Sequence, residues 1–145
     1  MQSLDTNVLL YAINRDCAEH EPCRALVAAA LDTPNDWVIA DQLWFELYRL
    51  LRHPSVLQRP LDAQTAARTV QWYREQSGWQ LCAWSPAQMP RLHAQWSTPD
   101  FPARRTFDAV LAHTLRANGV TRFYTRNVRD FTGAGFAQVI DPVTR

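Results

Sequence analysis

Three acidic residues stand beside apolar neighbours at widely separated points of this 145-residue chain: Asp5, Glu46 and Asp108. An isolated carboxylate is costly to bury, because the charge loses its hydration unless a cation or hydrogen-bond donors replace it. Three such acids at the borders of packed segments therefore predict a shared cation. Oxygen ligands suit Mg²⁺ or Mn²⁺ better than zinc. The chemistry that such a site supports is metal-assisted attack on a phosphate ester.

The acid near the N-terminus also has a structural interpretation. Asp5 precedes a segment with helical character that begins at Thr6, so its side chain could cap that helix. Thr6 and Asn7 could be capping or turn residues as well, and Thr6 could instead orient Asp5 or a metal-bound water. The residues alone leave both interpretations open.

The other two acids have possible ion-pair partners on their own helices. Glu46 could pair with Arg49 or Arg52, although it falls at the edge of the apolar face rather than on the solvent-exposed stripe. Asp108 gains from the dipole at the start of its helix, and Arg104 lies four residues earlier. Considered together with Asp5, these acids favour a site more strongly than any one of them does alone.

Alternating strand and helix patterns predict the elements that position these acids. Strands are expected at 2–5, 37–40, 79–83, 120–125 and 139–140. Helices are expected at 6–13, around 24–31, and at 41–52, 61–75, 85–96 and 104–118. Strands separated by helices favour a central parallel sheet covered on both faces. The expected fold is thus α/β, a single three-layer α/β/α domain spanning residues 1–145.

The loops that leave parallel strands meet at one edge of the sheet, where binding sites form. Asp5 ends the first predicted strand, and Thr125 to Asn127 follow the fourth. We therefore expect these residues to lie together.

Composition excludes several classes of protein. The chain has no lysine, which rules out a Walker-type phosphate loop and a Schiff-base enzyme. No apolar run is long enough to span a membrane, and the N-terminus lacks the pattern of a signal peptide. Three cysteines do not form a disulfide framework, and the spacing of Cys17, His20 and Cys23 is half of a zinc motif at most. A reducing cytoplasm is the expected location.

Four short blocks resemble the PIN-domain family, and more narrowly the VapC-type toxins of toxin–antitoxin pairs. They are Leu-Asp-Thr-Asn-Val from Leu4, Glu-Leu-Tyr-Arg from Glu46, Phe-Asp-Ala-Val-Leu-Ala from Phe107, and Thr-Arg-Asn-Val-Arg-Asp-Phe from Thr125. The blocks occur in the family's order, and the match extends to about Pro142. Each block is weak alone, whereas the set is fairly specific.

The resemblance implies an endoribonuclease whose acidic pocket binds Mg²⁺ or Mn²⁺ and whose cleavage leaves a 5′-phosphate. Asp5, Glu46 and Asp108 match the family's best-marked acids, as metal ligands and catalytic residues. The fourth position, often Asp in the family, is Asn127 here. Asp130 is close enough to replace it, or it could brace the turn before Phe131. A non-catalytic PIN-like module that binds RNA or protein through a degenerate metal site is the competing interpretation.

The resemblance also implies partners. A cognate antitoxin encoded alongside would inhibit the protein by placing an Arg or Lys side chain among the acids, and the protein would form a homodimer or a toxin–antitoxin hetero-oligomer. We expect the antitoxin to anchor in a groove beside Trp44 and Tyr48, with Trp96 as a further partner-binding residue. Trp37, Trp72 and Trp79 lie in segments that look like core.

Charge is distributed unevenly along the chain. Residues 101–145 carry seven arginines and three acids, whereas residues 1–100 carry eight arginines and eleven acids. Guanidinium groups suit phosphate contacts. We therefore expect the segment from Arg104 to Arg129 to face RNA, with Arg104, Arg105 and Arg126 as its binding residues.

Overall fold

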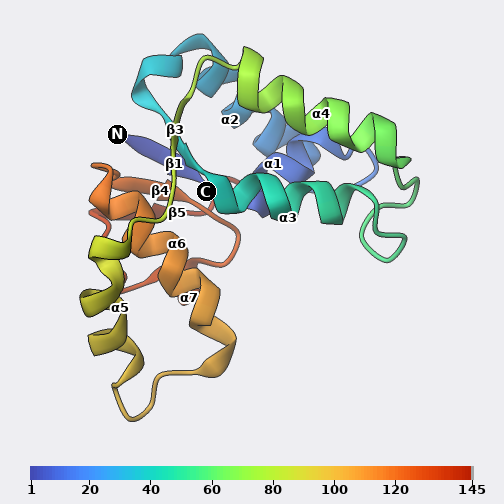
Figure 1. Ribbon diagram of the computed structural model, residues 1–145. Coiled ribbons are helices and arrows are strands. Elements are labelled where there is room, and N and C mark those ends of the chain that lie inside the picture. The colour runs from blue at the N-terminus through green and yellow to red at the C-terminus, as the bar shows by residue number, and fades with distance from the viewer. Residues whose placement is uncertain (145) are drawn as a thin grey trace.

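Five short parallel strands form the centre of the fold in the computed structural model, which describes residues 1–144 (Figure 1). They are β1 (Gln2–Leu4), β2 (Val38–Ala40), β3 (Gln80–Cys82), β4 (Arg122–Tyr124) and β5 (Gln138–Ile140). β4 lies between β1 and β5, and β2 pairs with β3. A single bridge between Gln2 and Trp37 joins β1 to β2. The predicted parallel sheet is confirmed, as a three-stranded part and a two-stranded part joined by that bridge.

Helices cover both faces of the sheet. They are α1 (Thr6–Ile13), α2 (His20–Asp32), α3 (Asp41–Leu51), α4 (Ala63–Gln76), α5 (Met89–Trp96), α6 (Thr106–Ala117) and α7 (Val128–Phe131), with 3₁₀ turns at Pro34–Asp36, Pro86–Gln88 and Ala103–Arg105. Figure 1 shows α1 to α4 on one side of the strands and α5 to α7 on the other. None of the helices in residues 1–144 is long and apolar enough to cross a membrane.

The hydrophobic core has two parts, one on each face of the sheet, because the side chains of a strand alternate between the two faces. Ile39 packs with the buried residues of α1 to α4, whereas Val38 and Ala40 pack with α6 and Phe123. Successive side chains of a strand point to opposite faces, so one strand contributes to both cores. The predicted three-layer α/β/α arrangement is therefore confirmed.

Two local expectations were wrong. α2 begins at His20 rather than near Arg24, because Pro22 sits in its first turn, where a backbone N–H has no partner within the helix. The tryptophans also differ from expectation: Trp72 is 48% exposed, whereas Trp44 is only 4% exposed and belongs to the core. The packing of neighbouring helices determines how exposed each of these side chains is. The spacing of apolar residues within one helix does not encode that packing.

Candidate metal-binding active site

Asp5 is a buried carboxylate at the carboxyl end of β1, and its side chain is held from two directions. One oxygen, Oδ1, accepts a 2.8 Å hydrogen bond from the backbone N–H of Thr6, so Asp5 caps α1 as its position suggests. The other, Oδ2, accepts a 2.8 Å bond from the hydroxyl of Thr125. The structural and the site interpretations of Asp5 are therefore compatible.

Thr125 links this acid to the end of β4. It is fully buried, and its hydroxyl oxygen also accepts the backbone N–H of Asn127 at 3.0 Å. The side-chain amide nitrogen of Asn7 makes a long 3.5 Å contact to Asp5. The side-chain oxygen of Asn7 accepts the backbone N–H of Arg126 at 3.4 Å. The ends of two adjacent strands thus form one polar network, as the sheet geometry predicts.

Glu46 reaches the same region from α3. One of its oxygens accepts the hydroxyl of Thr6 at 2.8 Å, and the other accepts the amide of Gln42 at 3.3 Å. The amide of Gln42 also donates to the backbone carbonyl of Phe107 at 3.2 Å. Gln42 therefore ties α3 to the start of α6. Sequence reasoning missed this residue, although its spacing of four from Glu46 is a usable signal.

Asp108 is partly buried in the first turn of α6. Burial is the main cause that raises its pKa, followed by the negative charges of Asp130 and Glu46. Arg104 and Arg105 oppose the rise but do not form an ion pair with Asp108 among the described residues. The ion pair that the sequence offered as an alternative is therefore not formed.

The three acids repel one another. Burial, together with the charges of Glu46 and Asp108, raises the pKa of Asp5 from 3.8 to about 6, although the bonds from Thr125 and Thr6 oppose the rise. None of the three acids has a cationic partner in residues 1–144, in contrast to Asp16, Glu21, Asp130 and Asp141. We call this set of three carboxylates the acid pocket.

A divalent cation fits the chemistry of this donor set, because hard carboxylate oxygens that form no ion pair with a cationic side chain are the ligands that Mg²⁺ and Mn²⁺ prefer. The side chains of residues 1–144 do not, as they stand, form a group of three or more His, Cys, Asp or Glu around one metal position. The Thr6 and Thr125 hydroxyls instead occupy oxygens of Glu46 and Asp5. The assignment of Asp5, Glu46 and Asp108 as metal ligands stays a prediction.

The fourth position differs in kind from the other three. Asn127 is exposed and precedes α7 without a side-chain hydrogen bond to the helix. Asp130 accepts a 2.6 Å bond from Arg104 and lies 3.3 Å from Nε of Arg105. The hydrogen bond from Arg104 lowers the pKa of Asp130. Asp130 therefore braces this corner of the fold, whereas Asn127 is free to meet a ligand.

The arginines expected to face RNA are already engaged. Arg104 and Arg105 meet Asp130, and Arg126 donates to Asp141 at 2.6 Å. They line one hollow with Asn127, Arg129 and Asp130. Their role in binding RNA stays a prediction, and their ion pairs reduce the positive charge available to it.

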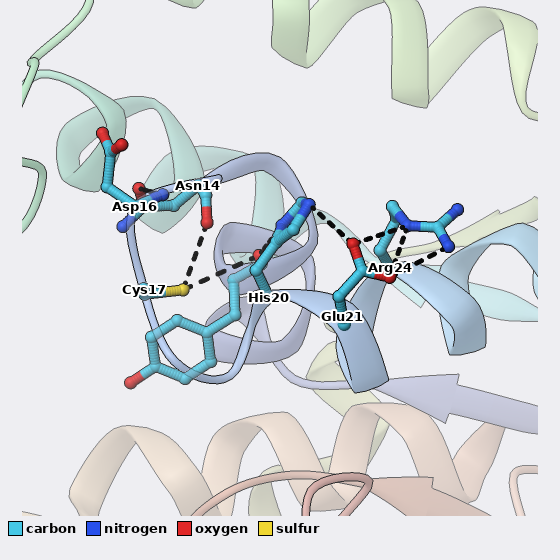
Figure 2. A network of polar contacts seen from close by, with 7 residues as sticks. Asn14, Asp16, Cys17, His20, Glu21 and Arg24 are labelled. Carbon is cyan, nitrogen blue, oxygen red and sulfur yellow. Dashed lines mark hydrogen bonds and ion pairs between the residues drawn. The ribbon is translucent and has the colours of Figure 1, made fainter.

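Cys17 and His20, which belong to the half zinc motif, make hydrogen bonds where the chain turns into α2 (Figure 2). The thiol of Cys17 donates to the carbonyl of Asn14 at 3.2 Å, and the ring of His20 meets the carbonyl of Tyr11 at 2.9 Å. Cys23 is buried in the core. These groups make hydrogen bonds and apolar contacts within the chain.

Three comparisons place this geometry among known proteins. Residues 3–136 match the family model for the PIN domain. Ribonuclease VapC24 from two strains of Mycobacterium tuberculosis is 43% identical over 144 residues, which cover 99% of this chain and 98% of the relative. The crystal structure of VapC20 from the same species, described as a sarcin–ricin loop cleaving toxin, matches with a TM-score of 0.70. Its identity is 18%, over 94% of this chain and 96% of that chain, so it shows the fold.

The raised pKa of Asp5 predicts how the stability of the cation-free protein depends on pH. The folded state holds the proton more tightly than the unfolded state, so this group's contribution to stability falls as pH rises from about 4 to about 6. A shift of this size corresponds to ~3 kcal/mol. We expect Asp5→Asn to remove this loss. In EDTA, the unfolding free energy of Asp5→Asn minus that of the parent should therefore increase over this range.

Urea denaturation at several pH values between 4 and 7 measures this difference. Asp130→Asn is the contrasting control, because the pKa of Asp130 is lowered and its replacement should cost stability above pH 4. Parallel curves for Asp5→Asn and the parent would show that the acid pocket does not destabilise the folded protein.

Proposed function

Because the chain belongs to the PIN-domain family, we propose that it is an endoribonuclease toxin that depends on a divalent cation and is neutralised by a cognate antitoxin. The observation that carries the proposal is the acid pocket, three carboxylates without a cationic partner among the described residues at the carboxyl edge of a parallel sheet. The 43% identity to a ribonuclease over nearly the whole chain supports RNA as the substrate. A toxin that cleaves cellular RNA acts in the cytoplasm.

Asp5, Glu46 and Asp108 would hold Mg²⁺ or Mn²⁺. The bound cation would neutralise phosphate charge and lower the pKa of a water molecule, the two requirements for hydrolysing a phosphodiester at neutral pH. The repulsion that raises the pKa of Asp5 favours this role, because a cation removes the cost of ionising the cluster.

The surrounding residues orient the acids. Thr125 and the N–H of Thr6 fix the carboxylate of Asp5, and Gln42 fixes Glu46. Hydrogen bonds of this kind hold ligand oxygens in one orientation. Asn127 carries no charge and could orient a water molecule by hydrogen bonding.

The antitoxin has a groove to bind. Trp44, Phe45 and Tyr48 of α3 and Val70 of α4 line a mostly apolar hollow of about 600 Å³. Phe45 is 72% exposed and is the neighbour of Glu46. A segment that folds into this groove would bring a cationic side chain to the acid pocket, which would exclude the catalytic metal.

Removal of a pocket carboxylate should abolish cleavage. We expect Asp5→Asn and Asp108→Asn to lower the rate of cleavage of a loop-containing RNA by at least ~100-fold, since several kcal/mol of transition-state stabilisation would be lost. EDTA should have the same effect, and Mg²⁺ or Mn²⁺ should restore the parent.

Asp32→Asn, at an exposed position at the end of α2, is the matched control and should keep full activity. Circular dichroism checks that each variant is folded. Cleavage that persists in EDTA would disprove the mechanism, and RNA binding without cleavage by the metal-loaded parent would favour a binding module.

Phe45 should anchor the antitoxin. Trp44 is unsuitable for this test because it is buried in the core, so its truncation would disturb folding. We expect Phe45→Ala to weaken the complex with the antitoxin encoded alongside by ~30-fold, corresponding to about 2 kcal/mol for a buried aromatic anchor.

Isothermal titration calorimetry measures this change. Leu81→Ala removes an exposed apolar side chain from β3, outside the groove, and should leave the affinity unchanged. Equal affinities for Phe45→Ala and the parent would mean that the antitoxin binds elsewhere.

A further inference from the structure

A second hollow, of about 250 Å³, lies between α5 and α6 and is lined only by basic and neutral residues. We call it the α5–α6 hollow. Arg91 of α5, His113 and Arg116 of α6, and Gly135 of the loop after α7 contribute to its wall. Figure 1 shows α5 lying alongside α6.

The two guanidinium groups of this hollow differ from three of the four that line the hollow beside Asn127. Arg104, Arg105 and Arg126 pair with Asp130 or Asp141. Neither Arg91 nor Arg116 forms an ion pair with a carboxylate of residues 1–144. Their charges are therefore available to an anion.

Gly135 positions one of these charges. A Cβ atom at Gly135 would lie 2.3 Å from Cζ of Arg116, so the guanidinium group lies directly against the glycine backbone. Any other residue would push the group away. The φ of +98° at this position also favours glycine.

His113 reports the positive potential of the hollow. Burial lowers its pKa, and the charges of Arg116 and Arg91 lower it further. Both guanidinium groups therefore act on the same small volume.

The hollow continues toward the acid pocket. The ring of His113 meets the side chain of Gln95 at 2.8 Å, and Gln95 lines the adjacent hollow that contains Asp108 and Ala112. Asp108 and Arg116 are eight residues apart on α6, which corresponds to ~12 Å along the helix axis. The small side chain of Ala112 lies between them on the same helix.

We propose that the α5–α6 hollow binds a backbone phosphate of the RNA strand whose cleavage site occupies the acid pocket. This inference rests on the proposed ribonuclease function and adds a second point of attachment for the substrate. Guanidinium groups bind phosphate oxygens in a bidentate manner, and contacts to phosphate position a strand without reading its sequence.

Binding of a fluorescein-labelled single-stranded oligouridylate in EDTA tests the proposal without cleavage. We expect Arg116→Gln to weaken binding about threefold to tenfold, and to reduce the slope of log K against log salt by ~0.7, the value for one phosphate contact on a single strand. Arg91→Gln should act in the same direction. Arg68→Gln, which removes an exposed arginine of α4, controls for the loss of net charge.

A pair of glycine variants tests the geometry. Gly135→Ala should displace Arg116 and weaken binding, whereas Gly133→Ala should not. Gly133 has a similar positive φ of +82°, but a Cβ atom there meets nothing within 4 Å. Gly133→Ala therefore reproduces the backbone strain without the displacement.

Cleavage kinetics in Mg²⁺ separate this inference from the proposed function. If the parent cleaves RNA, Arg116→Gln should raise KM with kcat unchanged, because the contact is far from the reacting atoms. Equal binding and equal salt slopes for Arg116→Gln and Arg68→Gln would overturn the inference and leave the proposed function intact. A parent that cleaves RNA without measurable binding of the oligouridylate would have the same consequence. A parent that binds through Arg116 but does not cleave would overturn the proposed function alone.

Discussion

The hydrogen bond from the hydroxyl of Thr125 to the carboxylate of Asp5 is the interaction on which the site depends. It joins the residues that follow β1 and β4, and it can form only if these strands pair in parallel with Leu4 opposite Tyr124. A register shift of one residue in either strand would turn that strand's side chain to the opposite face of the sheet and separate the two groups. The sheet therefore determines the position of the acid, and the buried hydroxyl determines its orientation.

This arrangement keeps a carboxylate where a carboxylate is unfavourable. Burial raises the pKa of Asp5, and Glu46 and Asp108 add to that effect. Hydrogen bonds from Thr125 and Thr6 offset only part of it. Natural proteins tolerate such local conflicts at functional sites, because removal of the conflict would also remove the binding capacity for a cation. The cost of ionising the acid pocket and the cation binding that we propose would have the same physical origin.

Local signals in the sequence predicted the elements whose ends are marked by particular residues. The helix from Thr6 to Ile13 has the predicted bounds, and the helix expected at 61–75 is α4, which Asp62 caps by accepting the N–H of Thr65. Contacts between distant segments were not predictable in this way. Gln42 donates a hydrogen bond to Phe107, 65 positions away in the sequence. Arg104 pairs with Asp130 rather than with Asp108, and this pairing depends on how the turn before α7 packs. Periodicity describes a single element, whereas these contacts depend on the relative positions of two.

The pairing of arginines with acids explains how a basic region and an acidic pocket coexist at one edge of the sheet. Arg104 and Arg105 are close enough to Asp108 to lower its pKa, yet both are held by Asp130. If Asp130 did not hold them, either guanidinium group could pair with Asp108 instead, and an arginine there would occupy the carboxylate oxygens that the proposed cation needs. Asp130 thus keeps the pocket negative by occupying its basic neighbours. Within the described residues Arg129, Arg91 and Arg116 form no ion pair with an acid, so the proposed RNA substrate can meet positive charge at these side chains. In the proposed function the three acids would bind the cation and the unpaired guanidinium groups would bind the anionic substrate, and ion pairs such as that between Arg104 and Asp130 keep arginines out of the acid pocket.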